Sequence, residues 1–348
     1  TIAGLGYYKI DSLMSALDKT LMIIILGYLC WISTYQHDFD LYMLIYGQSI
    51  SYFLAILISG VFLVRKIGWV IAKFDGAKII QVIKDSSPFV LILILMTAYN
   101  KLDGVMLGRL LDDDHYQAGV YASAYRFYEA ANMVGYLFAA LLLPMFAANM
   151  KNHTMLSELK SIGLRFVVLS SMLIVWSIFF YGEYFLKLLY DGYESGYLYT
   201  LYFLIFSYLM VAIAYIYGTL IVASGQVRNF NILLGIGLMV NIIFNLILIP
   251  IHFAIGAAVA TLITQTFVTI GQIWLVKKDL NITISRFDLQ RALLFCISSG
   301  MVFYLTSHLY SLPWTINLTV SILICLLLSF ILKIVNKEEV VSLLKRKI

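Results

Sequence analysis

The chain has 348 residues, of which 62% are hydrophobic and 12% are charged. A soluble domain of ordinary composition carries about 25% charged residues, and the mean hydropathy of this chain is +0.91. Because apolar surface in water costs free energy in proportion to its area, the composition excludes an ordinary soluble fold. The formal net charge of +5 is too small to indicate a nucleic-acid-binding protein. We therefore predict an integral membrane protein.

Continuously apolar stretches divide the chain, each close to the ~20 residues that a helix needs to cross the hydrocarbon core. Strands of a β-barrel would alternate in polarity instead, so helices are expected. Pro88 is expected in the first turn of the third stretch, and Pro250 and Pro313 in short links. We predict an all-α polytopic membrane protein with about ten transmembrane helices, over residues 17–35, 41–64, 87–110, 118–148, 164–181, 197–223, 230–250, 253–276, 292–310 and 314–335.

Basic residues indicate how these spans cross the membrane. If both ends of the chain are cytoplasmic, nearly all of the 24 Lys and Arg residues fall on the inner side. Only Arg109 and Lys187 fall in outer links, and Lys101 and Arg126 fall inside spans. Basic residues remain on the cytoplasmic side during insertion, so the pattern predicts a cytoplasmic C-terminus.

Charged side chains inside the membrane single out the third and fourth spans. The third contains Lys101 and Asp103 and the fourth contains Arg126 and Glu129. Each would cost about 2.5–3.5 kcal/mol near the bilayer centre, so they are expected to face one another, neighbouring helices or water. Residues two apart on a helix point to nearly opposite sides, so the third span is expected to present polar groups in two directions. We interpret these charges as lining a pathway rather than only fixing helix register.

A further polar stripe follows the fourth span, where Tyr121, Tyr125, Tyr128 and Asn132 recur at helical spacing. Helix packing is the favoured interpretation, with stacking against sugar rings as the alternative. Catalysis has little support, because the five histidines lie at span ends or in links and no Gly-rich phosphate-binding loop is present. We expect no enzyme activity, no cofactor and no catalytic metal.

Several motifs, in order along the chain, resemble the bacterial polysaccharide (O-antigen) flippases of the multidrug/oligosaccharidyl-lipid/polysaccharide exporter superfamily. The segments 102–108 (LDGVMLG) and 119–124 (GVYASA) resemble helices seven and eight of that family. The segments 188–193 (LLYDGY), 241–250 (NIIFNLILIP) and 256–261 (GAAVAT) resemble the link after helix nine and helices eleven and twelve.

The resemblance implies a fourteen-helix, two-lobed transporter that moves an undecaprenyl-diphosphate-linked oligosaccharide to the outer leaflet by alternating access. It places the chain in the bacterial cytoplasmic (inner) membrane, among membrane lipids, with a polysaccharide polymerase and a chain-length regulator as partners. Against that pattern the chain is expected to be N-terminally truncated, with a two-lobed bundle whose first lobe is incomplete. The expected domains are 1–85 (last two helices of the first lobe and a linker), 86–278 (a six-helix second lobe) and 279–348 (two more helices and a basic tail).

Site residues follow from the charges and from the resemblance together. The expected substrate-binding residues are Lys101, Arg126, Asn100 and Tyr125, whose cations would neutralise the diphosphate. Asp103 and Glu129 are the candidates for coupling to a proton or to sodium. The alternatives are a cation-coupled multidrug exporter of the same superfamily, a membrane-embedded glycan polymerase or acyltransferase, and an inactive remnant.

Overall fold

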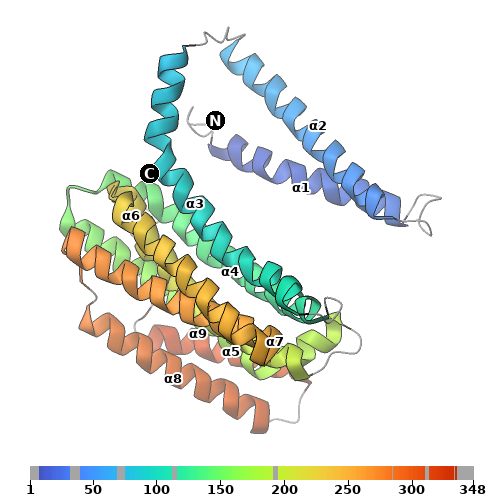
Figure 1. Cartoon of the computed structure of the whole chain (residues 1–348). Coiled ribbons are helices and arrows are strands. Elements are labelled where there is room, and N and C mark those ends of the chain that lie inside the picture. Colours follow the sequence, from blue (N-terminus) through green and yellow to red (C-terminus); the bar gives the residue numbers. More distant parts are fainter. Residues whose placement is uncertain are drawn as a thin grey trace. The chain divides into compact units, whose positions relative to one another are not determined.

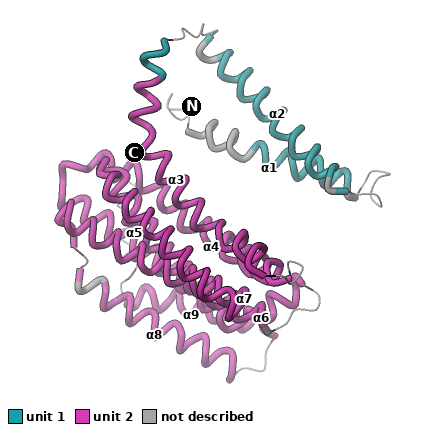
Figure 2. Tube along the Cα trace, viewed as in Figure 1, with its two compact units in different colours: residues 1–79 teal, residues 80–348 magenta. Residues whose placement is uncertain are grey.

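The computed structural model describes residues 8–31, 40–68, 75–111, 116–190, 195–283, 285–309, 313–332 and 334. Every regular element in these ranges is a helix, which confirms the all-α prediction (Figure 1). The chain divides into two compact units, residues 1–79 and 80–348 (Figure 2). Nothing in the structure tests the three expected domain boundaries, which stay a prediction.

The first unit is built on two long helices, α1 (Tyr8–Trp31) and α2 (Leu41–Ile67). The helices approach closely at Gly47, where an added Cβ would lie 2.7 Å from Leu26 Cδ2. One polar contact also joins them, because Lys19 Nζ lies 3.4 Å from the hydroxyl of Tyr52. The first expected span falls largely within α1, and its residues 32–35 lie outside the described ranges.

The second unit contains α4 (Tyr116–Ala148), α5 (His153–Leu189), α6 (Ser195–Ser224), α7 (Val227–Leu280), α8 (Arg286–Leu309) and α9 (Trp314–Ile331), together with nearly all of α3 (Gly76–Leu110). Its main core lies among α4, α6 and α7, where Tyr128, Tyr208 and Phe230 are fully buried. A second cluster joins α8 and α9 to α5 through Trp176, Phe303 and their neighbours.

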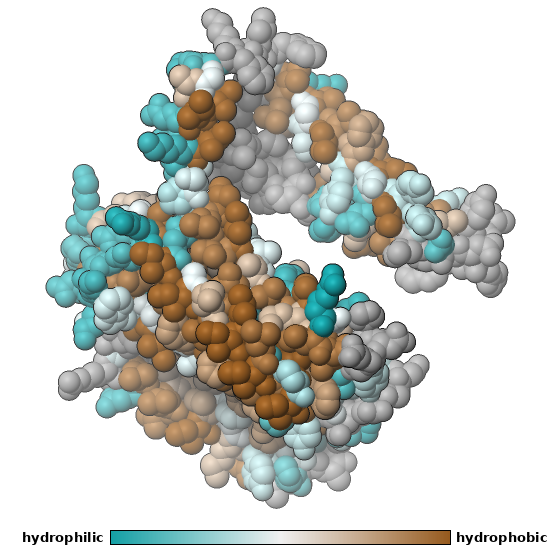
Figure 3. Space-filling view, viewed as in Figure 1, coloured by the Kyte–Doolittle hydropathy of each residue, from teal (hydrophilic) through white to brown (hydrophobic). Residues whose placement is uncertain are grey.

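Eight helices of the described chain are long and apolar enough to cross a membrane. Large hydrophobic side chains such as Ile94, Leu137 and Ile236 stay exposed, as expected where lipid rather than water surrounds the helices. On the face shown in Figure 3, hydrophobic residues gather along the middle of the helices and hydrophilic residues gather near helix ends. The chain is therefore a polytopic membrane protein.

The helix α7 is a hairpin of two antiparallel halves, which contain the seventh and eighth expected spans. The direction changes at Phe253, whose φ of 55° and ψ of −132° are not helical. The halves then pack closely, because a Cβ on Gly237 would lie 2.6 Å from Val268 Cγ2. Pro250 precedes this break within helical residues, so the expected link is a sharp turn rather than a loop.

The helix α3 begins earlier than expected, so the placement of Pro88 in its first turn is wrong. Proline has no N–H, and the carbonyl of Lys84 therefore lacks its usual helical donor. The hydroxyl of Ser87 donates to that carbonyl at 2.9 Å and replaces the missing bond. The helix consequently continues through the proline, and Figure 1 shows that it is bent.

Candidate functional site

The two charged residues of α3 point in different directions. The side chain of Lys101 is 58% exposed, whereas Asp103 is 0% exposed. Residues two positions apart are separated by about 200° around a helix, so one faces outward when the other faces the core. The structure thereby confirms the expectation that this helix presents polar groups on two sides.

On its exposed side, Lys101 forms an ion pair with Glu129 of α4. Its Nζ also lies 4.9 Å from the ring centroid of Tyr125, a cation–π distance. Arg126 is exposed on α4 as well, and within the described residues no carboxylate pairs with it. The result is a cationic, partly aromatic surface made by two helices, which we call the α3–α4 face (Lys101, Tyr125, Arg126 and Glu129).

The tyrosine stripe of α4 is mostly buried. The rings of Tyr121 and Tyr125 stack with centroids 5.5 Å apart, and those of Tyr125 and Tyr128 are 5.1 Å apart. Tyr121 and Tyr128 lie in the core, and the hydroxyl of Tyr125 donates to the carbonyl of Asn100 at 2.9 Å. Helix packing, the favoured interpretation, is confirmed for Tyr121 and Tyr128. Tyr125 is half-buried, and its ring contacts Lys101.

Asp103 has no ionic partner among the described residues, and of the three surroundings expected for the charged side chains it has neighbouring helices. Four neutral donors surround it instead. Its Oδ1 accepts from Asn241 Nδ2 at 2.9 Å and from Asn245 Nδ2 at 2.6 Å. Its Oδ2 accepts from Tyr121 at 2.8 Å and from the Thr261 hydroxyl at 2.5 Å. We call this group the Asp103 cluster.

Burial gives the Asp103 cluster a cost in free energy. All five side chains are at most 3% exposed, and the Oδ1 atoms of Asn241 and Asn245 have no hydrogen-bond partner among the described residues. A buried carboxylate without a counter-charge and buried acceptors without donors both cost free energy. A bound cation or proton would remove the first cost, and a cation held by carboxylate, amide and hydroxyl oxygens would also satisfy the acceptors. One carboxylate charge matches a monovalent ion best.

The hairpin of α7 is what assembles this cluster. Asn241 and Asn245 lie one turn apart on the first half, and Thr261 lies on the second half. The turn is tight, because a Cβ on Gly256 would lie 2.2 Å from the carbonyl oxygen of Leu248. The resemblance motifs contained these three residues, but sequence analysis assigned them no role. Two amides one turn apart in an apolar span were the signal that could have indicated them.

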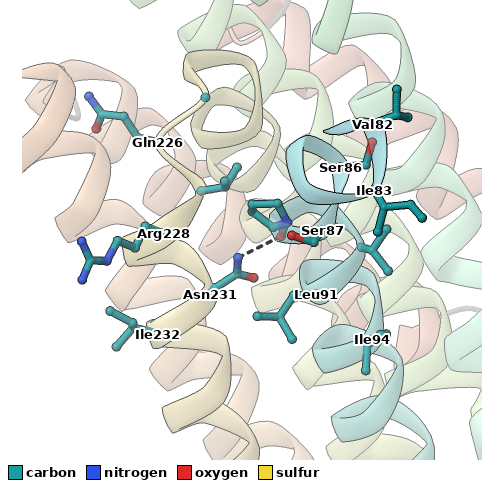
Figure 4. Close-up of a pocket in the computed structure, with 14 residues that line it drawn as sticks. Val82, Ile83, Ser86, Ser87, Leu91, Ile94, Gln226, Arg228, Asn231 and Ile232 are labelled. Atoms are coloured by element: carbon teal, nitrogen blue, oxygen red, sulfur yellow. Dashed lines mark hydrogen bonds between the residues drawn. The ribbon is translucent and has the colours of Figure 1, made fainter. Parts of the chain in front are cut away.

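Two cavities adjoin α3. One, about 1160 Å³, is a mostly apolar groove between α3 and the start of α7. Figure 4 shows Asn231 in this groove pointing toward α3, where its Nδ2 donates to the carbonyl of Pro88 at 2.8 Å, while Arg228 points away. The other, about 540 Å³, lies among α3, α4, α6 and α7 and includes Asn100.

Comparison with known proteins gives one family match. The family model described as polysaccharide biosynthesis protein matches residues 10–150. That range contains Lys101, Asp103, Arg126 and Glu129 and ends before the α7 members of the Asp103 cluster. A search of curated proteins finds no match. The apolar helices indicate a multi-pass membrane protein, and the similarity of residues 10–150 to this family model supports the resemblance found in the sequence.

Proposed function

We propose that the protein is a flippase for an undecaprenyl-diphosphate-linked oligosaccharide and works by alternating access coupled to a cation. The observation that carries the proposal is the two-sidedness of α3. Lys101 faces the exposed side and Asp103 lies in the core only two residues away. Movement of this one helix would change the surroundings of a substrate-facing cation and of a buried anion together.

The α3–α4 face suits an anionic head group. A diphosphate cannot cross ~30 Å of hydrocarbon without compensation of its charge. Arg126 lacks a carboxylate partner in the described chain, and the carboxylate that pairs with Lys101, from Glu129, is itself exposed. Exposed ion pairs contribute ~1 kcal/mol or less, so a diphosphate can displace Glu129 from Lys101. The aromatic ring of Tyr125 is then available to a sugar.

The Asp103 cluster is the better of the two candidates for cation coupling. Glu129 already has a cation partner, whereas Asp103 has neutral donors and two neighbouring amide oxygens that no described residue pairs with. No phosphate-binding loop indicates an ATP-driven motor, so an ion gradient is the expected energy source. The lipid tail would stay in the bilayer while the head group passes, and the C-terminus, on this proposal, is cytoplasmic. A polymerase and a chain-length regulator remain the proposed partners.

The test compares Lys101→Ala and Arg126→Ala with Lys187→Ala in reconstituted vesicles. Lys187 is a matched control, because it pairs with Glu183 at 2.8 Å with the same side-chain exposures as the Lys101–Glu129 pair. Loss of a charge-assisted contact should slow flipping of a fluorescent polyprenyl-diphosphate sugar roughly 10-fold or more. Flipping should stay at the wild-type rate in Lys187→Ala. Equal rates in all variants would contradict the assignment, and export of cationic dyes instead would favour the multidrug exporter.

A further inference from the structure

The cavity of about 540 Å³ is a crevice that opens between α3 and α4. Leu93, Thr97 and Tyr136 are exposed and line its mouth, whereas α6 and α7 form its floor. The floor carries two glutamines of α7, Gln265 and Gln272, and each is only 2% exposed. A crevice that served only to accommodate lipid would not need amide groups at its base.

Gln272 places an unpaired polar atom on the floor of the crevice. Its Oε1 is buried and has no hydrogen-bond partner in the part of the chain that the structure describes, which costs free energy if the crevice is dry. Space is left beside it, because Gly218 of α6 has no side chain and an added Cβ would lie 3.5 Å from that Oε1. The cavity is far larger than the ≳10–15 Å³ that one water needs, and its floor supplies the polar partners that hold water.

Gln265 lies between this crevice and the Asp103 cluster. Its Nε2 donates to Asn100 Oδ1 at 3.0 Å, which joins α7 to α3. Asn100 precedes Asp103 by about one turn of α3, and Gln265 follows Thr261 by one turn of α7. The two helices are therefore bridged twice at successive turns, once by the Asn100–Gln265 amide pair and once by the bond from Thr261 to Asp103.

We propose that the α3–α4 crevice is a water-filled path by which a monovalent cation reaches Asp103, with the Asn100–Gln265 amide pair as its inner barrier. The inference rests on the proposed function, because it supplies the access route for the coupling ion. Water in the crevice satisfies Gln272 and hydrates the ion up to the barrier. Opening of the amide pair exposes Asp103, and the freed amide oxygens can coordinate the passing ion.

The first experiment measures whether the crevice is wet. Ala214→Cys and Thr219→Cys, both lining the crevice, are made after Cys30, Cys296 and Cys325 are replaced by Ser. The control is Ile270→Cys, on α7 between Gln265 and Gln272 but 61% exposed on the apolar outer surface. A cationic, membrane-impermeant thiosulfonate reacts with the thiolate, so the crevice cysteines should react at least ~10-fold faster than the control. Equal rates would overturn the wet crevice.

The second experiment measures whether the amide pair is a barrier. Asp103 is modified in intact vesicles by a water-soluble carbodiimide and the adduct is quantified by peptide mass spectrometry. Gln265→Ala should raise the rate several-fold, and the conservative Gln265→Asn, which shortens the side chain, should raise it less. Thr266→Ala, at the adjacent position outside the crevice, should leave the rate unchanged. If Gln265→Ala does not raise the rate of Asp103 modification, the Asn100–Gln265 amide pair is not a barrier.

These measurements separate this inference from the flippase proposal. Labelling and carbodiimide modification report access of water and solutes to named residues, and neither requires movement of a lipid-linked sugar. If the crevice is wet and gated while flipping shows no dependence on an ion gradient, the coupling proposal fails and the access path stands. If flipping depends on the gradient while the crevice is dry, the path proposed here fails and the flippase proposal stands.

Discussion

At the scale of single residues, the clearest prediction concerns Asp103. If a monovalent cation or a proton binds there, it stabilises the folded protein by mass action, by about 2.7 kcal/mol at 100 times its Kd. Asp103→Asn keeps the shape and removes the charge that attracts the ion. The Tm of the detergent-solubilised wild type should rise with sodium at fixed pH or with acidification at fixed sodium, and the variant should lose that response.

Glu129→Gln is the matched control, because Glu129 is the other carboxylate considered for coupling and sits on the exposed α3–α4 face. Its removal should leave the ion-dependent rise in Tm intact. A response that survives in Asp103→Asn but disappears in Glu129→Gln would move the coupling site to the α3–α4 face.

Residue-level inference from the sequence succeeded where helix geometry alone decides. The opposite directions of Lys101 and Asp103 follow from their spacing on one helix. The partners of Asp103 did not follow, because Asn241 and Thr261 are far along the chain and periodicity gives the face of a residue without its neighbours. A search for oppositely charged residues would also not find these partners, since the donors that surround Asp103 are neutral.

At the scale of secondary-structure elements, the sharp turn in α7 is sensitive to one position. A Cβ on Gly256 would lie 2.2 Å from the backbone oxygen of Leu248, and a backbone atom cannot rotate away as a side chain can. Gly256→Ala should therefore cost on the order of 1–3 kcal/mol and lower the Tm. Gly235→Ala on the same element meets nothing within 4 Å and should be neutral or slightly stabilising. A Tm of Gly256→Ala equal to that of Gly235→Ala would contradict this account.

Element boundaries were predictable only in part. Apolar runs located the spans, because burial in lipid requires them, but helices such as α3 extend well beyond the lipid core. The extension past Pro88 depends on a local compensation, the bond from the hydroxyl of Ser87 to the carbonyl of Lys84. Such compensation depends on the rotamer of one side chain, which hydropathy does not report.

At the scale of the whole molecule, the orientation in the membrane is open to direct test in the second unit. Arg228, Lys277 and Lys278 lie near one set of helix ends, and Lys187 lies near the other set. Because basic residues are retained on the inner side, Gln226 in the short link between α6 and α7 should face the cytoplasm. In a background without native cysteines, Gln226→Cys should react with an impermeant maleimide only after the cells are permeabilised.

The opposite side supplies the control for that orientation. Lys187→Cys, at the end of α5, should react in intact cells, because α5 crosses the membrane once between it and the end near Asn152, which we predict to be cytoplasmic. The same two positions also fix where the proposed ion path leads, since the inner ends of α3 and α7 would then lie on the cytoplasmic side of the Asp103 cluster. Reaction of Gln226→Cys in intact cells, with protection of Lys187→Cys, would invert the topology and place the inner ends of α3 and α7 on the outer side of the membrane.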